Sequence, residues 1–125
     1  MERMTQSLED YLEAIFVLRN EKKTAMVKDV ARFLGVKMPS VVKAIHELKK
    51  LELVTQESYA PIQLTQEGET LAQHIHSRHK LLRSFLIKLG VSAENADKDA
   101  CLMEHILSAE TLDRIRIYTE KKNHK

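Results

Sequence analysis

The residues best suited to chemistry in this chain of 125 residues are a thiol, a carboxylate and an imidazole near its C-terminal end. Cys101, Glu104 and His105 occur in the stretch CLMEHIL, which otherwise consists of core-type residues. Positions i, i+3 and i+4 share one face of a helix, so the three side chains are expected to point the same way. Sulfur, oxygen and nitrogen donors together suit a transition metal. Polar groups on an apolar face also need a partner, and we therefore expect a metal site here.

Two acids and a further histidine, outside this stretch, could complete such a site. Asp10 and Glu13 lie three residues apart on the first expected helix, so they project from one side of it. His79 is in line with the apolar residues of a long helix and is expected to face the interior. Simpler explanations stay open: Asp10 suits a helix cap, Cys101 a small buried hydrophobe, and His79 a core histidine with satisfied hydrogen bonds.

Composition limits the classes of protein. Hydrophobic residues make up 43% of the chain, with only three glycines and two prolines, which favours a folded protein with short loops. One cysteine cannot form an internal disulfide, and no apolar run reaches the length of a membrane span, so we expect a cytoplasmic protein without a membrane partner. The net charge is only +2, so any signal for nucleic acid must be local.

The first half of the chain has the order of a winged helix-turn-helix. Ser7 is expected to cap a first helix that ends near Arg19, followed by a polar turn. A short second helix stops at Gly35, and Pro39 opens a third. Two β-prone runs then predict a hairpin, or wing, with an exposed tip at residues 57–60. Helix, short helix, turn, helix and wing is typical of DNA-binding domains.

The second half is expected to be all helical. A long helix begins at residues 65–67 and ends at Gly90, Ser92 caps a helix that runs to about Leu107, and Ser108 begins a last one. The predicted fold is therefore mainly α: a winged helix-turn-helix domain over residues 1–70 and a helical domain over residues 71–125.

Lysines gather on the third helix, where a recognition helix should lie. Residues 37–50 carry four lysines against one acid, although a solvated helix face would have the same pattern. Ser40 and Lys43 can reach base edges, and Val42 can touch a thymine methyl group. Lys28, Lys49, Lys50 and the wing tip near Tyr59 are expected to contact phosphates. The expected DNA-binding residues are Lys28, Lys37, Pro39, Ser40, Val42, Lys43 and, at the wing tip, Tyr59.

Three stretches together resemble a known family. SLEDYLEAIFVL at residues 7–18, SRHKLLRSFLIKLGV at 77–91 and DACLMEHILS at 99–108 are similar to the metal-dependent repressors of the diphtheria toxin repressor and manganese transport regulator family. The resemblance implies a winged helix domain followed by a helical metal-binding and dimerisation domain. It also implies a homodimer that binds palindromic, double-stranded operator DNA. The chain is expected to stop before the SH3-like third domain of the larger members.

The resemblance further implies a ligand set for a divalent ion. Glu13 matches an additional ligand of manganese-type members, whereas a cysteine ligand is typical of iron-type members. Fe²⁺ and Mn²⁺ therefore both stay open, and Co²⁺, Zn²⁺ or Ni²⁺ could substitute. The residues that match the family's primary metal site are Asp10, His79, Cys101, Glu104 and His105.

Two positions depart from the iron-type members. Their ancillary metal site requires a glutamate where this chain has Arg83 and a histidine where it has Asp97. We therefore expect the ancillary site to be missing.

These observations predict a metal-dependent repressor of metal-ion homeostasis, which is not an enzyme and has no protein substrate. A metal-independent winged-helix regulator that responds to a small molecule or to thiol oxidation is the nearest alternative. A hydrolytic or transfer enzyme would use Cys101 as nucleophile and His105 or His79 as base. The sequence has no glycine-rich loop that would stabilise an oxyanion, which disfavours the enzyme.

Overall fold

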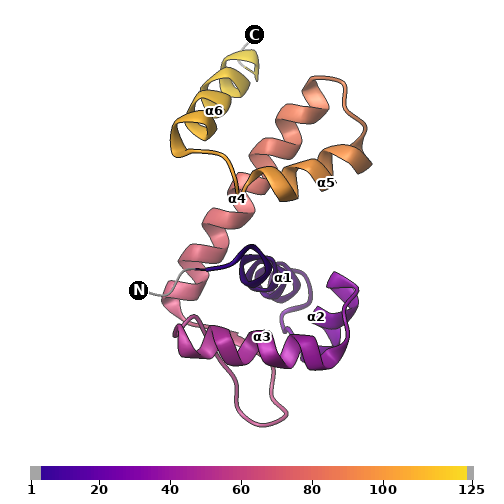
Figure 1. The fold of residues 1–125 in the computed structure, drawn as a ribbon, viewed down its shortest axis with the longest axis vertical. Coiled ribbons are helices and arrows are strands. Elements are labelled where there is room, and N and C mark those ends of the chain that lie inside the picture. Colours follow the sequence, from indigo (N-terminus) through magenta and orange to yellow (C-terminus); the bar gives the residue numbers. More distant parts are fainter. Residues whose placement is uncertain (1–3, 124–125) are drawn as a thin grey trace. The chain divides into compact units, whose positions relative to one another are not determined.

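The computed structural model describes residues 4–123 and consists of two compact units, residues 1–74 and 75–125. The described residues form helices and one two-stranded sheet, which confirms the predicted mainly helical fold (Figure 1). No helix among them is long and apolar enough to cross a membrane. The elements are α1 (Gln6–Lys22), α2 (Val27–Leu34), α3 (Met38–Lys50), β1 (Val54–Thr55), β2 (Gln63–Leu64), α4 (Gln66–Lys88), α5 (Ala93–Met103) and α6 (Ala109–Asn123).

The first helix is longer than predicted at both ends. Thr5 is its N-cap, with a side-chain oxygen that accepts a hydrogen bond from the backbone N–H of Leu8 at 3.1 Å. The prediction that Ser7 caps this helix is therefore wrong, because α1 has already begun at Gln6. The helix continues to Lys22, and its C-cap Lys23 has a left-handed φ of 72°. The polar residues before it contain neither glycine nor proline and so do not stop the helix.

The helix-turn-helix and the wing form as predicted. Gly35 ends α2 with a left-handed φ of 68°, a conformation that costs glycine little. Pro39 is the second residue of α3, where its missing N–H leaves no helical hydrogen bond unmade. The strands β1 and β2 pair antiparallel, with Val54 opposite Leu64. In Figure 1, α1, α2 and α3 lie together and the loop of the wing extends beyond α3.

The core of the first unit is mainly aliphatic. Helix α1 packs against α2 and α3, and the apolar faces of all three helices are excluded from solvent. Burial of such side chains contributes roughly 1.5–3 kcal/mol each. This packing fixes α3 with its opposite face in solvent. The largest fully buried side chains of this unit are Leu12, Ile15, Val30, Val41, Leu48 and Val54.

The start of α4 is held tightly against the wing. The hydroxyl of Thr65 accepts a hydrogen bond from the N–H of Gly68 at 3.0 Å and donates one to the carbonyl of Glu52 at 2.8 Å. A Cβ atom at Gly68 would overlap the carbonyl oxygen of Leu53. Only glycine allows the helix to approach the backbone this closely.

An ion pair ties α4 to α1 within the first unit. The guanidinium of Arg19 donates two hydrogen bonds to the carboxylate of Glu69, one of them from Nη2 to Oε2 at 2.7 Å. Hydrogen bonding to Arg19 holds the pKa of Glu69 below its usual value, and the same bond raises the pKa of Arg19. The pair is bidentate, the strong form of such contacts, although both side chains are about one third exposed.

The second unit is built around the later turns of α4. Its hydrophobic core comes from three helices: Leu82 and Leu86 of α4, Ala96 and Ala100 of α5, and Leu112 of α6. Ser92 caps α5 as predicted, because its Oγ accepts a hydrogen bond from the N–H of Asn95. Ser108 accepts one from Thr111 at the start of α6 in the same way. Small residues on α5 allow this helix to lie close to α4.

Replacing Glu69 by Gln is expected to lower the free energy of unfolding at pH 7 by at most about 1 kcal/mol, since partial exposure screens the pair. The pKa of Glu69 is lowered in the folded state. Its stabilising effect is therefore fully present above the unfolded-state value of about 4.3 and is lost as the pH falls through the folded value. Urea unfolding at pH 7 and near pH 2 measures the difference from the unsubstituted protein.

The matched control is Glu67→Gln, which removes an exposed acid from the same turn of α4. It should change the stability little at either pH. An equal loss for Glu69→Gln at both pH values would contradict the role of the ion pair.

Candidate metal centre and nucleic-acid interface

Three side chains of metal-binding type converge in the second unit. His79 comes from α4, Cys101 from α5, and Glu104 follows directly after α5. One potential ligand atom of each lies within 4.8 Å of the other two. Nitrogen, sulfur and oxygen donors at this separation can share one transition-metal ion. Packing of α5 against α4 therefore brings together residues that are more than twenty positions apart in sequence.

The helix that carries this cluster ends earlier than predicted. Helix α5 was expected to run to about Leu107 but ends at Met103, and residues 104–106 form turns. The N–H of Glu104 still bonds to the carbonyl of Ala100 at 3.1 Å, whereas that of His105 bonds to Leu102 at 3.3 Å. The backbone thus tightens from i+4 to i+3 bonding at this point. Cys101, Glu104 and His105 are therefore not on one face of a continuous α-helix, and that part of the prediction is wrong.

The side chain of Glu104 is the buried acid of this cluster. The residue is 3% exposed, and its Oε1 lies 3.4 Å from Nε2 of His105, whose side chain is also largely buried. Glu104 thus lies near His79 and Cys101 and is also in contact with His105. Removing a carboxylate from water is costly unless positive charge lies beside it. A divalent cation fits this requirement.

The imidazole of His79 has one nitrogen in contact with another side chain and one without a partner. Its Nε2 lies 2.9 Å from Oδ1 of Asp97, and the ring is mostly buried. Its Nδ1 is buried and has no hydrogen-bond partner among the described residues. A buried nitrogen without a hydrogen bond is unfavourable, but a neutral imidazole with a free lone pair is a common metal ligand. The residues present therefore fit a metal ion.

The two remaining predicted ligands lie on α1, in the first unit. Asp10 and Glu13 are half-buried and three residues apart, so they share a face of this helix. Because Thr5 is the N-cap, Asp10 lies beyond the first turn and does not act as a capping acid. The structure thus brings together His79, Cys101, Glu104 and His105 in one unit. The participation of Asp10 and Glu13 stays a prediction.

Arg83 and Asp97 interact with each other directly. Nε of Arg83 lies 3.4 Å from Oδ1 of Asp97, the same oxygen that contacts His79. Arg83 offers only donors and no lone pair for a metal. The expectation that an ancillary metal site is missing stays a prediction, and this ion pair is consistent with it.

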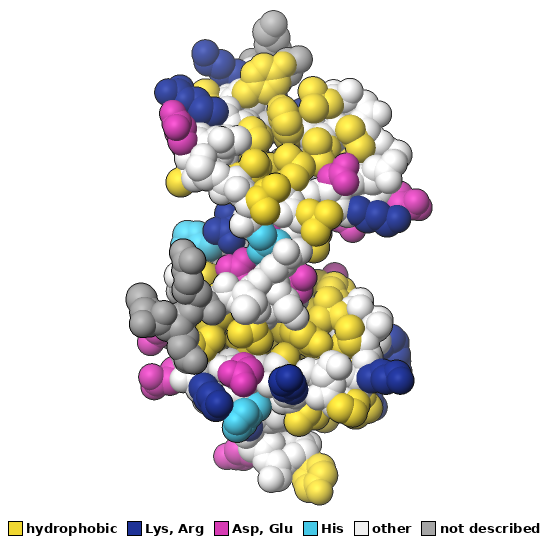
Figure 2. Space-filling model, in the orientation of Figure 1, with side chains coloured by type: hydrophobic (Ala, Val, Ile, Leu, Met, Phe, Trp, Pro, Cys, Tyr) yellow, Lys and Arg dark blue, Asp and Glu magenta, His cyan; other side chains and the backbone are white. Residues whose placement is uncertain are grey.

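The residues predicted to bind DNA are all exposed on the first unit. Val42 is 56% exposed and Tyr59, at the wing tip, is 99% exposed. Figure 2 shows basic side chains over the region of α3, mixed with acidic and apolar ones. An apolar side chain such as Val42 in solvent beside lysines is typical of a surface that contacts bases. The exposed positions are Lys28, Lys37, Pro39, Ser40, Val42, Lys43 and Tyr59.

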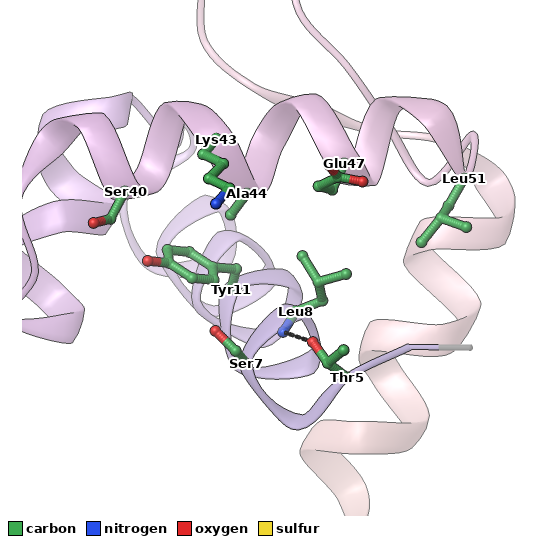
Figure 3. A pocket seen from close by; sticks show the side chains of 9 residues that line it. All are labelled: Thr5, Ser7, Leu8, Tyr11, Ser40, Lys43, Ala44, Glu47 and Leu51. Atoms are coloured by element: carbon green, nitrogen blue, oxygen red, sulfur yellow. Dashed lines mark hydrogen bonds between the residues drawn. The ribbon is translucent and has the colours of Figure 1, made fainter. Parts of the chain in front are cut away.

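A hollow of about 660 Å³ separates the start of α1 from α3 (Figure 3). Lys43 and Ser40 line it from α3, and Ser7 and Tyr11 line it from α1. The hydroxyls of Ser7 and Tyr11 therefore lie beside the proposed recognition helix, although the sequence did not single them out for this role. Because Thr5 is the N-cap of α1, the hydroxyl of Ser7 has no capping role. A helix start at Thr5 is thus the signal in the sequence that marks Ser7 as a candidate for another function.

Family models match both halves of the chain. Residues 3–61 match the "iron dependent repressor, N-terminal DNA binding domain", and residues 65–124 match the "iron dependent repressor, metal binding and dimerisation domain". A transcriptional regulator MntR of Escherichia coli O6:H1 is 42% identical over 114 residues, which is 91% of this chain and 74% of the relative.

Solved structures of metal-dependent regulators have the same fold. The structure of the manganese regulator SloR aligns with a TM-score of 0.82 and 28% identity, over 94% of this chain and 55% of its own. A manganese-dependent transcriptional repressor in complex with manganese aligns with a TM-score of 0.81 and 26% identity, over 90% of this chain and 52% of its own. The chain thus spans about half the length of these solved proteins. In agreement with its sequence motifs, the chain belongs to the iron-dependent repressor family of transcriptional regulators, with a DNA-binding domain followed by a metal-binding and dimerisation domain.

Proposed function

We propose that this chain is a cytoplasmic repressor of metal-ion homeostasis genes that binds palindromic operator DNA as a homodimer when it holds a divalent transition metal. The observation that carries the proposal is the convergence of His79, Cys101 and Glu104 in the second unit. Their donor types match the metal-binding role that the family description gives to this region.

The metal ligands are proposed to come from both units. In the second unit His79, Cys101, Glu104 and His105 supply nitrogen, sulfur and oxygen donors. Asp10 and Glu13 of α1 are proposed to add carboxylates, which their type and their spacing on one helix face support. A bound divalent ion supplies the positive charge that lets these acids lie close together. Acids on α1 and ligands after α5 would then restrict the two units to one arrangement.

The donor set favours Fe²⁺ or Mn²⁺ as the physiological ion. The thiolate of Cys101 favours Fe²⁺ over Mn²⁺, whereas the carboxylates of Asp10, Glu13 and Glu104 suit either ion. A similar solved protein is described as a complex with manganese, which supports Mn²⁺ as a candidate. Co²⁺, Zn²⁺ or Ni²⁺ is expected to bind in vitro, since nitrogen and sulfur donors hold these ions well.

DNA recognition is assigned to α3 and the wing. Ser40, Val42 and Lys43 lie on the solvent face of α3, where they would meet base edges in the major groove. Lys37 is the N-cap of α3 and would lie beside these residues at the DNA. Lys28 and the wing tip near Tyr59 would contact phosphates, which positions the domain without specifying sequence. In a twofold dimer the two α3 helices would have to enter major grooves about 34–36 Å apart, or a multiple of that distance.

The surface of the second unit supports a homodimer. Leu89 is 60% exposed and Tyr118 48%, and both line a groove of about 470 Å³ together with Phe85 and Ile115. Figure 2 shows a broad apolar area on this unit. Apolar patches of this kind usually mark protein interfaces. Dimerisation would bury this area and place two DNA-binding units in one molecule.

Metal binding is proposed to act by population shift. Without a metal ion that binds residues of both units, two compact units joined through one helix can adopt several arrangements. Few of these arrangements place the DNA-binding units correctly on an operator. Ligands from both units would favour the arrangement that binds DNA. Allosteric coupling is typically about 1–3 kcal/mol, or 5- to 150-fold in affinity, and it is reciprocal. Operator DNA should therefore tighten metal binding by the same factor.

The test of the proposal is operator binding measured with and without metal. Duplexes selected from a random pool with Mn²⁺-loaded protein serve as the probe, and affinity is compared in Mn²⁺, in anaerobic Fe²⁺ and in a chelator. The chelator is expected to weaken binding about 5- to 150-fold. Glu104→Gln should reproduce this loss in the presence of metal, whereas Glu94→Gln, at an exposed position of α5, should not. Binding that is indifferent to chelator would favour the metal-independent regulator.

The thiol of Cys101 is tested by changing the ligand type. Cys101→Ser should abolish the near-ultraviolet band that thiolate-to-Co²⁺ charge transfer gives in the Co²⁺-loaded protein, because no other cysteine is present. Cys101→Glu should raise the affinity for Mn²⁺ relative to Co²⁺, since Mn²⁺ prefers oxygen ligands. Competition titrations with a fluorescent chelator measure the ranking. An unchanged band and ranking would show that the thiol does not bind the metal.

Two lysines of α3 are expected to respond differently to substitution. Lys43→Ala should lower affinity for the selected operator by about 1–3 kcal/mol and relax the preferred sequence. Lys49→Ala, at the exposed end of α3, should weaken all duplexes alike and reduce the slope of log affinity against log salt by about one. Binding titrations over a salt series with operator and unrelated duplexes separate the two. A sequence-selective loss in Lys49→Ala would contradict the assignment.

A further inference from the structure

Asp97 of α5 contacts two residues of α4 with one carboxylate oxygen. Its Oδ1 lies 2.9 Å from Nε2 of His79 and 3.4 Å from Nε of Arg83. His79 and Arg83 are four residues apart, so they lie on the same face of α4. The proposed metal ligand His79 is thus in contact with a group that is not itself part of the ligand cluster.

The chemistry of this contact fixes which nitrogen of His79 can bind a metal. A carboxylate only accepts hydrogen bonds, so Nε2 of His79 must carry the hydrogen that it donates to Asp97. In the neutral imidazole Nδ1 then keeps its lone pair. This Nδ1 is the buried nitrogen that has no hydrogen-bond partner among the described residues. One of the two ring nitrogens of His79 lies within 4.8 Å of potential ligand atoms of Cys101 and Glu104. Because Asp97 occupies Nε2, Nδ1 is the nitrogen left for an ion.

We infer that Asp97 is a positioning residue for the metal site: it holds His79 in the Nε2–H form and thereby presents Nδ1 to the ion, while Arg83 anchors the Asp97 carboxylate. The inference rests on the proposed function, because it requires His79 to be a ligand. A carboxylate bonded to a metal-ligating histidine also fixes the orientation of the ring.

Arg83 gives Asp97 a fixed position that it would otherwise lack. The side chain of Asp97 is 60% exposed and that of Arg83 is 44% exposed, so neither is held by burial. An exposed carboxylate with one partner can rotate into solvent. The second donor, one turn along α4 from His79, limits this rotation. Because exposed ion pairs contribute little to folding, removing Asp97 should affect the metal more than the fold.

The first experiment measures Co²⁺ affinity by competition with a chromophoric chelator. Asp97→Ala is expected to weaken Co²⁺ binding about 10- to 100-fold, the usual effect of losing such a partner. Asp97→Asn should restore part of the affinity, because its amide oxygen still accepts the hydrogen bond from Nε2. The matched control is Asp99→Ala, which removes the same charge from an exposed position of the same helix and should leave the affinity nearly unchanged.

A double substitution separates positioning from general electrostatics. In a His79→Ala background, Asp97→Ala should have almost no further effect on Co²⁺ affinity, because the ring that it orients is absent. Thermal unfolding of the metal-free variants should show little change, since Asp97 is exposed.

The second experiment observes the tautomer directly. Long-range ¹H–¹⁵N spectra of the metal-free protein, at a mildly alkaline pH where imidazoles are neutral, should show His79 with its hydrogen on Nε2. In Asp97→Ala the signals should move toward a mixture of the two tautomers. A purely structural role for Asp97 would not produce this change.

The outcomes separate this inference from the proposed function. Unchanged Co²⁺ affinity in His79→Ala would overturn the metal site as assigned, and this inference with it. A loss in His79→Ala without a loss in Asp97→Ala would overturn only the positioning role. Equal losses in Asp97→Ala and Asp99→Ala, or an Nδ1–H tautomer in the unsubstituted protein, would overturn it as well.

Discussion

The candidate metal centre of the second unit depends on a carboxylate that is buried in the fold. Glu104 is 3% exposed, whereas the buried residues of the hydrophobic core in this unit are leucine and alanine. Burial of an acid is expensive without nearby positive charge, so the residues around Glu104 have to supply or attract a cation. The nitrogen and sulfur donors of His79 and Cys101, and the imidazole of His105, are arranged around it. The proposed metal chemistry therefore centres on the side chain of Glu104.

Much of the fold could be predicted from local signals. Gly35 and Pro39 mark the helix-turn-helix because each has backbone requirements that few positions satisfy. The ends of α1 and α5 were predicted less well. Thr5 and Ser7 are both good caps, and which of them is used depends on where the helix begins to pack. The early end of α5 follows from no residue type, since Glu104 and His105 both tolerate helical geometry.

The residues that converge in the second unit could be expected from the sequence, whereas the contacts that support them could not. His79, Cys101, Glu104 and His105 are conspicuous by residue type and by their place among apolar residues, and the structure brings them together. Asp97 was noticed only as a departure from a family pattern. Its contacts with His79 and Arg83 connect residues 18 and 14 positions apart, and they exist because α5 folds back along α4. Local periodicity carries no information about such tertiary contacts. It also carries none about the hollow that Ser7 and Tyr11 line together with residues of α3.

The division of the proposed ligands between two units gives each group a different role. The second unit offers four candidate donors of three types, and four ligands are the usual number in structural zinc sites. A site complete within one unit would bind metal without any effect on the other unit, since coupling requires the ion to favour one arrangement over the rest. Asp10 and Glu13 are the only members of the set on the DNA-binding unit. Under the proposed function the second-unit residues thus determine which ion binds and how tightly. The two acids of α1 determine whether that binding reaches the DNA.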